Sequence, residues 1–476
     1  MNTRWQQRFA GAWLVLVSIS TCAADDWPQW LGPQRDSVWR ETGIVDKFPA
    51  EGPAVKWRVP IAGGYAGPAV ANGRVFVTDY AAEGDRTPDP NSRSKLRGRE
   101  RVWCLSAADG RMLWKHEYEC AYEISFPAGP RATPTVDGDR VYTLGAEGDL
   151  LCLRAGDGAV LWSRNFARDY QAATPLWGYS GHPLVDGDKL FCVAGGPGSI
   201  AVAFDKHTGK ELWRALSAKE QGYSPPTLIE AGGKRQLVIW DAEAIHGLDP
   251  DTGREYWSVP LDPNYAMSIV TPRQAGRYLF AGGIVNKSAM LKLGPDRAAE
   301  EISSQPGPIH RDPAAEPGIG QPTAEVIWRG ARGRGIGPVM VTPFLTGEYL
   351  YGVDGKGELR CVELATGEQR WTTCAATTGR DRGEHSACAF LVKNGDRFFL
   401  ASETGELIIA RLTPERYTEI SRAKIIEPTG VAFGRSVWWS HPAFANRCVF
   451  ARNDRELVCL SLAADERTVC PQEGID

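Results

Sequence analysis

The chain alternates short apolar runs with polar turns in a pattern that returns from end to end. One clear copy, residues 132–162, contains an apolar run, a turn pair, two alternating runs, a second turn and a closing tryptophan. Alternation of apolar and polar residues over four to eight positions is typical of half-buried β-strands. Each copy therefore predicts four antiparallel strands, named A to D here in chain order.

Two turns and one tryptophan mark the copies. The A–B turn recurs at Asn72-Gly73, Asp137-Gly138, Asp186-Gly187, Gly232-Gly233, Gly276, Thr346-Gly347, Asn394-Gly395 and Asn446. The C–D turn recurs at Asp109-Gly110, Asp157-Gly158, Thr208-Gly209, Thr252-Gly253 and Thr366-Gly367, and the closing residues are Trp57, Trp114, Trp162, Trp213, Trp257 and Trp371. A repeat of about 50 residues has the length of one propeller blade. The pattern predicts an all-β, eight-bladed β-propeller in which these tryptophans pack between blades.

The two ends of the repeat complement each other. Trp57 lies in a D-like run with no A to C strands before it, and residues 456–462 form a C-like run with no D strand after it. We expect one blade built from both termini to close the ring. The propeller is predicted over residues 53–462, with a 25–52 extension, a 463–476 tail and insertions near 81–100 and 294–322.

The first 24 residues predict an export signal. Basic residues precede an apolar stretch at residues 9–19, and small residues up to Ala24 precede Asp25, which is the order of a secretory signal peptide. The stretch is too short to span a bilayer. Cleavage after Ala24 predicts a periplasmic or secreted protein, and lipidation at Cys22 is the disfavoured alternative because threonine precedes that cysteine.

Charge and cysteine content describe the expected environment. Loss of Arg4 and Arg8 with the signal would change the formal charge from −4 to −6, a balance that disfavours nucleic acid as a partner. The 11 cysteines would become 10, an even number for an oxidising compartment. The expected disulfides flank predicted hairpins and join Cys361 to Cys374 and Cys448 to Cys459. The other cysteines are interpreted as buried apolar residues.

Three copies carry a more specific motif. They read GDLLCLRAGDGAVLW, GSIAVAFDKHTGKELW and GELRCVELATGEQRW, and they resemble the PQQ-like (pyrroloquinoline quinone) repeat over nearly all of the chain after residue 24. No copy has the paired Gly-His and Trp-Asp of WD repeats. The resemblance implies either a quinoprotein alcohol dehydrogenase holding pyrroloquinoline quinone and Ca²⁺, or a BamB-type propeller without a catalytic site.

The longer connections are the expected place for function. In a four-stranded meander the A–B and C–D turns share one face, and the B–C and D–A connections share the other, where loops on a rigid scaffold commonly bind partners. Loops assigned to that second face contain basic residues, namely Arg93, Lys95, Arg97, Arg99, Arg101, Arg329, Arg332, Arg334, Arg380 and Arg382. They also contain aromatic residues, namely Tyr122, Phe126, Trp177, Tyr179, Tyr223, Tyr265, Trp438 and Trp439. A basic rim favours anionic ligands or acidic partners, and mobile or mutually packed loops are the alternative interpretation.

Proline begins strand A in seven of the eight blades. The residues just before these prolines are predicted to ring the central channel, because strand A is the inner edge of each blade; they are Gly67, Thr133, His182, Pro225, Thr271, Thr342 and His441. His182 and His441, with His385 nearby, are candidate ligand-binding residues. We expect the first two to face each other across the channel rather than to bind one metal.

The catalytic motifs of the dehydrogenase class are missing. The chain has no Cys-Cys pair, CxxCH, HExxH, GxSxG or P-loop. The sequence therefore favours an exported, non-catalytic scaffold that needs no cofactor and binds an envelope protein or a small anionic or carbohydrate ligand. The candidate face is His182, His385, His441, Tyr179, Tyr223, Trp439, Arg332 and Arg334. A PQQ- and calcium-dependent alcohol or sugar dehydrogenase and a carbohydrate-binding propeller remain as alternatives.

Overall fold

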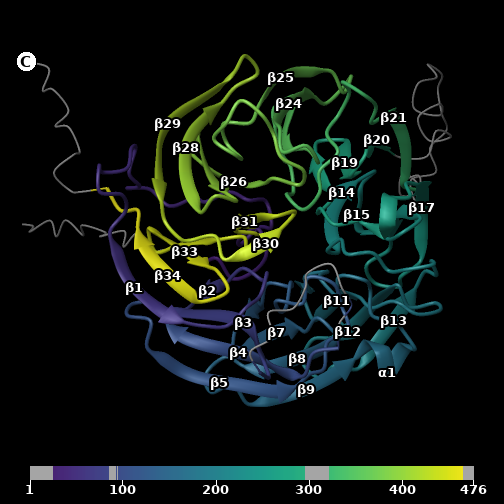
Figure 1. The fold of residues 1–476 in the computed structure, drawn as a ribbon. Helices are drawn as coiled ribbons and strands as arrows, with labels where there is room; N and C mark the ends of the chain where they lie inside the picture. Colours follow the sequence, from purple (N-terminus) through teal and green to yellow (C-terminus); the bar gives the residue numbers. More distant parts are fainter. Residues whose placement is uncertain (1–24, 85–92, 94, 295–320, 465–476) are drawn as a thin grey trace, which may run out of the picture.

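Eight four-stranded antiparallel sheets surround a central axis in the computed structural model, which describes residues 25–84, 93, 95–294 and 321–464 (Figure 1). The predicted all-β, eight-bladed propeller is confirmed. Residues 1–24, the signal and Cys22 among them, lie outside the described residues, as do most of the insertion near 294–322 and the tail from 465.

Strands A to D follow chain order in the first seven blades. Blades 1 to 4 are formed by β2 (Ala69–Ala71), β3 (Arg74–Ala82), β4 (Gly98–Ser106) and β5 (Met112–Glu119); β6 (Thr135–Asp137), β7 (Arg140–Leu144), β8 (Asp149–Arg154) and β9 (Val160–Asn165); β10 (Leu184–Asp186), β11 (Lys189–Val193), β12 (Ala201–Asp205) and β13 (Glu211–Ala215); β14 (Thr227–Ala231), β15 (Lys234–Trp240), β16 (Ala244–Leu248) and β17 (Glu255–Pro260).

The remaining blades include the one that closes the ring. Blades 5 to 8 are formed by β18 (Arg273–Ala275), β19 (Tyr278–Gly283), β20 (Lys287–Gly294) and β21 (Thr323–Arg329); β22 (Phe344–Thr346), β23 (Tyr349–Val353), β24 (Leu359–Glu363) and β25 (Gln369–Thr373); β26 (Ala389–Asn394), β27 (Arg397–Ser402), β28 (Glu406–Leu412) and β29 (Tyr417–Lys424); β32 (Ala443–Ala445), β33 (Cys448–Arg452), β34 (Glu456–Ser461) and β1 (Val55–Pro60).

Three small elements lie in D–A connections between the blades. They are α1 (Phe166–Tyr170), the 3₁₀ turn η1 (Asn264–Ala266), and a separate hairpin made of β30 (Gly430–Ala432) and β31 (Arg435–Val437).

The predicted joining of the two ends is observed in blade 8. β1 pairs antiparallel with β34, so that Trp57 lies opposite Cys459 and Val59 opposite Leu457. Figure 1 shows β1, near the start of the chain, beside β34, near its end. Backbone hydrogen bonds between the two ends therefore complete the circle, which removes the exposed sheet edges that an open array would have.

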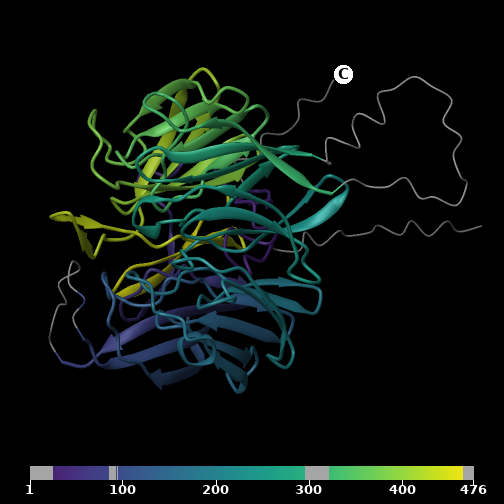
Figure 2. The same cartoon turned by 90° about the vertical axis from the view of Figure 1, so that its right-hand side faces the viewer.

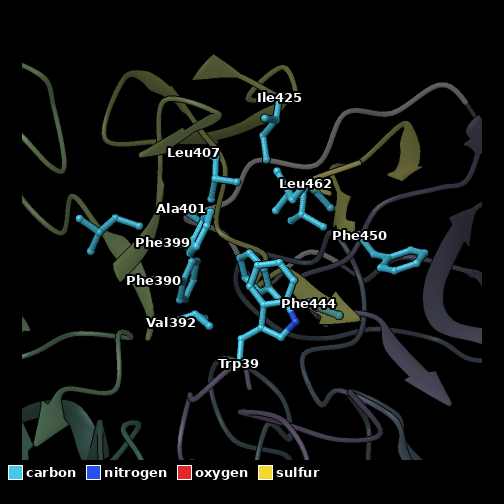
Figure 3. Packing of buried hydrophobic residues seen from close by; sticks show 14 of the residues in the cluster. Trp39, Phe390, Val392, Phe399, Ala401, Leu407, Ile425, Phe444, Phe450 and Leu462 are labelled. Carbon is cyan, nitrogen blue, oxygen red and sulfur yellow. The ribbon is translucent and has the colours of Figure 1, made fainter. Parts of the chain in front are cut away.

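The core is divided among the interfaces between neighbouring blades. One cluster joins blades 2 and 3 through residues such as Tyr142 and Phe204, and the largest spans blades 6, 7, 8 and 1. Figure 3 shows Trp39, from the segment before the propeller, packed beside Phe399 of β27 and Phe444 of β32. The N-terminal extension thus contributes to the hydrophobic core of the ring.

Closing tryptophans join six of the blades to the blade that follows. Their indole N–H groups donate to backbone carbonyls at the C–D turn of the following blade, in the pairs Trp57–Ala107 (3.0 Å), Trp114–Ala155 (2.9 Å), Trp162–Lys206 (3.0 Å), Trp213–Pro250 (3.2 Å), Trp328–Leu364 (2.7 Å) and Trp371–Thr413 (2.8 Å). Trp257 instead donates to the Gln236 side chain of its own blade, at 2.6 Å. The repeated Gly of the C–D turn lies against the preceding tryptophan and leaves no room for a side chain there.

Substitution at one of these glycines tests that contact. Gly158 has φ +76°, and a Cβ there would lie 2.5 Å from Trp114, whereas Gly138 has φ +58° with nothing within 4 Å. Both alanine variants acquire backbone strain, but only Gly158→Ala also clashes. We expect Gly158→Ala to destabilise the protein by about 1–3 kcal/mol more than Gly138→Ala, measured by denaturant unfolding. Equal losses would show that the tryptophan contact is unimportant.

Candidate functional site

The central channel is occupied by the N-terminal segment, residues 25–41. The segment enters beside the A–B turns, where Asn72 N–H donates to Asp26 (3.1 Å), and Trp27 pairs with Val70 on the inner edge of blade 1. It leaves on the same side, where the Asn394 side chain donates to the carbonyls of Trp39 (3.0 Å) and Glu41 (2.8 Å). We call the face with the A–B and C–D turns the turn face, and the opposite one the long-loop face.

Trp30 reaches the ring of residues that precede the strand A prolines. Its indole ring stacks on His182 of blade 3 (centroids 4.1 Å apart, 9° between planes) and meets His441 of blade 8 edge-on (4.9 Å). Its N–H donates to Thr271 of blade 5 at 2.9 Å. The two histidines therefore contact the same indole, one through a stacked ring and the other edge-on, and Trp30 links them within the channel.

Both channel histidines are held neutral. The His182 Nδ1 accepts a hydrogen bond from Thr133 N–H at 2.8 Å, and burial, together with the charge of Arg35, lowers its pKa well below the ordinary value. His441 Nδ1 lies 2.6 Å from the Pro442 carbonyl, so this nitrogen is the donor and Nε2 the acceptor. Burial lowers the His441 pKa to about 4, although that hydrogen bond raises it. These side chains act as packing and hydrogen-bonding groups of the closed channel.

The ring residues also link neighbouring blades. Thr133 N–H of blade 2 donates to His182 of blade 3, and Thr271 N–H of blade 5 donates to Thr342 Oγ1 of blade 6 at 3.1 Å. Gly67 belongs to the same ring, and a Cβ there would lie 2.2 Å from the His441 carbonyl oxygen. The positions that sequence analysis placed around the channel are thus largely structural.

An aromatic patch on the long-loop face is a better candidate for binding. It consists of Phe126, His385, Phe433 and Trp439. The ring centroid of Phe433 lies 4.7 Å from that of His385 and 6.4 Å from that of Trp439. The centroids of Trp439 and Phe126 are 5.9 Å apart. Phe433 is at the tip of the β30–β31 hairpin, which stands out from the ring in Figure 2. The patch therefore gathers rings from three separate D–A connections.

Two charged residues, Arg435 and Glu403, contact the rings of the patch. The Arg435 guanidinium lies 5.7 Å from the Phe433 ring centroid and pairs with Glu403 at 2.9 Å. Glu403 also accepts from the Trp439 indole at 3.3 Å. One buried carboxylate thus fixes both the arginine under Phe433 and the neighbouring indole.

The hairpin tip has a strained backbone. Ala432 pairs with Arg435, leaving Phe433 and Gly434 as a two-residue turn with φ of +51° and +76°. Such a turn favours Asn-Gly or Gly-Gly, and a bulky side chain there costs about 1–2 kcal/mol. Phe433 nevertheless keeps 56% of its surface exposed.

Two predicted aromatic residues do not belong to this face. Tyr179 is 2% exposed and packs 5.5 Å from Phe166 in the core between blades 2 and 3. Tyr223 is 3% exposed, and its hydroxyl donates to Glu220 at 3.2 Å. The prediction that they are presented to a ligand is wrong, because the D–A connections fold over them.

The predicted arginines lie elsewhere as well. Arg334 Nε donates to the Thr366 carbonyl at 2.7 Å, beside the C–D turn of blade 6. Arg332 is in the same tight turn, which is closed by mutual hydrogen bonds of Ala331 and Arg334. The chain bends here directly after β21, so these arginines lie near the turn face. Of the eight proposed face residues, the structure brings together only His385 and Trp439 in the patch.

Neither expected disulfide is present. Cys361, Cys374, Cys448 and Cys459 are free thiols. Cys361 lies opposite Trp371 in the β24–β25 ladder, so Cys374 is beyond the paired residues and lies against Gly383 instead. In blade 8 the partner of Cys448 is Ser461, while Cys459 faces Phe450. Cys448 and Cys459 are nevertheless diagonal neighbours on one face of the β33–β34 ladder, and their thiols are in hydrogen-bond contact without being joined. Flanking a hairpin therefore brought this pair together, whereas Cys374 lies beyond the residues of β25 that pair with β24.

The donor set does not fit the calcium and quinone of the dehydrogenase alternative. Within the described ranges, no group of three His, Cys, Asp or Glu side chains is arranged to hold a metal ion. Trp30 fills the channel between His182 and His441. The recess beside the patch, lined by Tyr65, Val431 and Trp439 among others, holds about 10 Å³, room for about one water molecule. No catalytic step is derived from these residues.

No helix within the described ranges is long and apolar enough to cross a membrane.

Comparisons with known proteins agree with this architecture. Residues 98–312 match the family model described as outer membrane protein assembly factor BamB. BamB from Moraxella catarrhalis is similar in structure with a TM-score of 0.51 and 15% identity, covering 86% of this chain and 99% of that chain. Quinohemoprotein alcohol dehydrogenase from Comamonas testosteroni has a TM-score of 0.55 and 14% identity, covering 94% and 82%. A search of curated protein sequences finds no match. At these identities the structural likeness shows the fold alone, an eight-bladed β-propeller, and residues 98–312 are similar to the BamB family model.

Proposed function

We propose that the protein is an exported, non-catalytic scaffold that binds a protein partner in the cell envelope through the aromatic patch on its long-loop face. The observation that carries the proposal is Phe433, a large apolar side chain kept exposed on a strained hairpin tip. Strain of this kind persists where the surrounding structure enforces it and is often part of a binding function. The matched family, described as an outer membrane assembly factor, is one for which a protein partner is expected.

The patch has the features of an interface centre. Aromatic residues and arginine commonly contribute most of the affinity at protein interfaces, and here four rings and Arg435 lie together. The Glu403 carboxylate orients Arg435 and Trp439 before any partner arrives. Such preorganisation lowers the entropy lost on binding. The recess beside the patch has room for about one water molecule, whereas small-molecule sites typically enclose about 300–1,000 Å³.

Site-specific photo-crosslinking tests this proposal in cells that produce the full chain. A photoreactive phenylalanine analogue at position 433 is expected to give a discrete crosslinked band, identified by mass spectrometry. Position 112 is the matched control, because Met112 is 52% exposed but lies on an outer strand. Absence of a discrete band at 433, or the same products from both positions, would contradict the proposal. Recovery of labelled glycan in place of a protein at 433 would favour the carbohydrate-binding alternative.

A further inference from the structure

Two arginines in the central channel have no acidic partner. Arg35 belongs to the N-terminal segment, and Arg273 begins strand β18 of blade 5. Neither forms an ion pair with any carboxylate in the part of the chain that the structure describes, and the Nε atom of each is buried without a hydrogen-bond partner. Burial lowers the pKa of Arg35 to about 9 and that of Arg273 to about 10. Each guanidinium therefore keeps one buried N–H without a partner, and neither is ion-paired within the described residues.

Arg452 is a buried arginine in which every side-chain nitrogen donates a hydrogen bond, and it serves as a comparison for Arg35. That side chain is 0% exposed and donates to the carbonyls of Asn453 (3.0 Å), Thr78 (2.9 Å) and Ala62 (2.5 Å), using all three of its nitrogens. Arg35 differs. Its terminal nitrogens make longer contacts, at 3.1 Å to the Pro183 carbonyl, 3.4 Å to Gln29 Oε1 and 3.5 Å to the carbonyls of His182 and Pro226, and its Nε has none. Compared with Arg452, Arg35 makes longer hydrogen bonds and leaves its Nε without an acceptor.

The surroundings of Arg35 are positive or neutral. Its guanidinium lies near His182 and contributes to the low pKa of that imidazole. Arg273 donates to the carbonyls of Arg35 (2.7 Å) and Asp36 (2.8 Å), which brings a second guanidinium to the same loop. The Asp36 carboxylate is directed toward Arg40, its ion-pair partner. Asp36 also acts on Arg273, whose pKa it raises against the effect of burial, whereas no carboxylate offsets the burial of Arg35.

We propose that the channel binds a small oxyanion against Arg35, with Arg273 as the second cation of the site. A guanidinium presents a planar fork of donors that matches carboxylate, phosphate or sulfate, and charge-assisted bonds of this kind are stronger than bonds to neutral carbonyls. Arg35 is half-buried, and Pro33 and Gln34 beside it are exposed, so solvent reaches this loop. Binding here would stabilise the closed N-terminal segment, because the site includes residues of that segment and of blade 5. The site is separate from the aromatic patch and does not depend on the proposed partner.

Thermal unfolding of the whole mature chain with increasing inorganic phosphate tests the site, with sodium chloride adjusted to hold ionic strength constant. The wild-type midpoint is expected to rise saturably, and Arg35→Gln to bind at least tenfold more weakly. Arg273→Gln should weaken binding in the same direction. Arg332→Gln is the matched control, because Arg332 is an exposed arginine in the tight turn near β21. Parallel series with sulfate and acetate distinguish a phosphate-selective site from a general oxyanion site.

A second measurement separates binding from folding defects. In wild-type protein, phosphate is expected to raise the His182 imidazole pKa, followed by NMR, because the anion offsets the charge of Arg35. Arg35→Lys, which keeps the charge but lacks the fork, should bind phosphate more weakly while remaining folded. A wild-type midpoint that rises no more than that of Arg35→Gln, with an unchanged His182 pKa, would overturn the proposal.

Discussion

Replacing Trp39 with alanine is expected to lower the free energy of unfolding by about 3–5 kcal/mol, the usual cost of removing a buried tryptophan. Trp39 is 1% exposed, packs 5.4 Å from Phe399 and 5.2 Å from Phe444, and donates to Glu41 at 2.8 Å. The loss would leave a cavity between blades 7 and 8 and weaken the segment that fills the channel. The change in the free energy of unfolding is measured by urea unfolding, with tryptophan fluorescence and circular dichroism as the two signals.

Phe433→Ala is the control for that experiment. This aromatic residue is 56% exposed at the hairpin tip, and alanine keeps the Cβ that causes the strain, so its removal should change stability by less than about 0.5 kcal/mol. If Trp39→Ala unfolds at the same urea concentration as Phe433→Ala, the N-terminal segment does not belong to the folded core and the description of the channel is wrong.

Acid is expected to destabilise the protein through the channel histidines. The His441 pKa is lowered from its ordinary 6.5 to about 4, and that of His182 is lowered well below its ordinary value. The unfolded chain therefore binds more protons in this range, so stability is complete above pH 6.5 and falls as pH decreases toward 4. His441 alone accounts for about 3 kcal/mol, at 1.36 kcal/mol for each unit of pKa shift.

A histidine with the opposite shift partly offsets this dependence. Burial lowers the pKa of His246, but hydrogen bonds and charges of Asp241 (3.2 Å) and Glu255 (2.7 Å) outweigh it, so the net shift is upward. Its contribution is present below pH 6.5 and is lost as pH rises through the folded-state pKa. Urea unfolding between pH 7 and pH 4.5 should give a steeper decline for the wild type than for His441→Gln. Equal slopes would exclude His441 as a source of the acid sensitivity.

The fold could be predicted because its signals are local and repeated. The A–B turns recur in all eight copies and the C–D glycines and closing tryptophans in most of them, and each acts within one blade or between adjacent ones. Even the joining of β1 to β34 follows from two incomplete copies that complement each other. Trp328 was not predicted to be a closing tryptophan, because a long insertion in the sequence separates β20 from β21.

The candidate site was predicted less well because its residues lie outside the repeat. The N-terminal extension has no repeated pattern, so nothing indicated that Trp30 would fill the channel between two histidines. Tyr179 and Tyr223 precede strand A as Trp439 does, but whether a connection covers its aromatic residue depends on tertiary packing. The one local signal that was missed is Phe433-Gly434, a residue pair that forms the turn of the hairpin between β30 and β31.

A calorimetric titration of the purified protein with pyrroloquinoline quinone and Ca²⁺, paired with a dye-reduction assay over simple alcohols and sugars, tests most directly whether the channel is closed to a cofactor. The N-terminal segment closes the channel through Trp30, and we propose that the exposed aromatic patch is the functional surface. We predict no stoichiometric binding and no turnover, with photo-crosslinking at position 433 unaffected by the quinone. Tight one-to-one binding with reduction of the dye would contradict the claim and assign the channel a catalytic role.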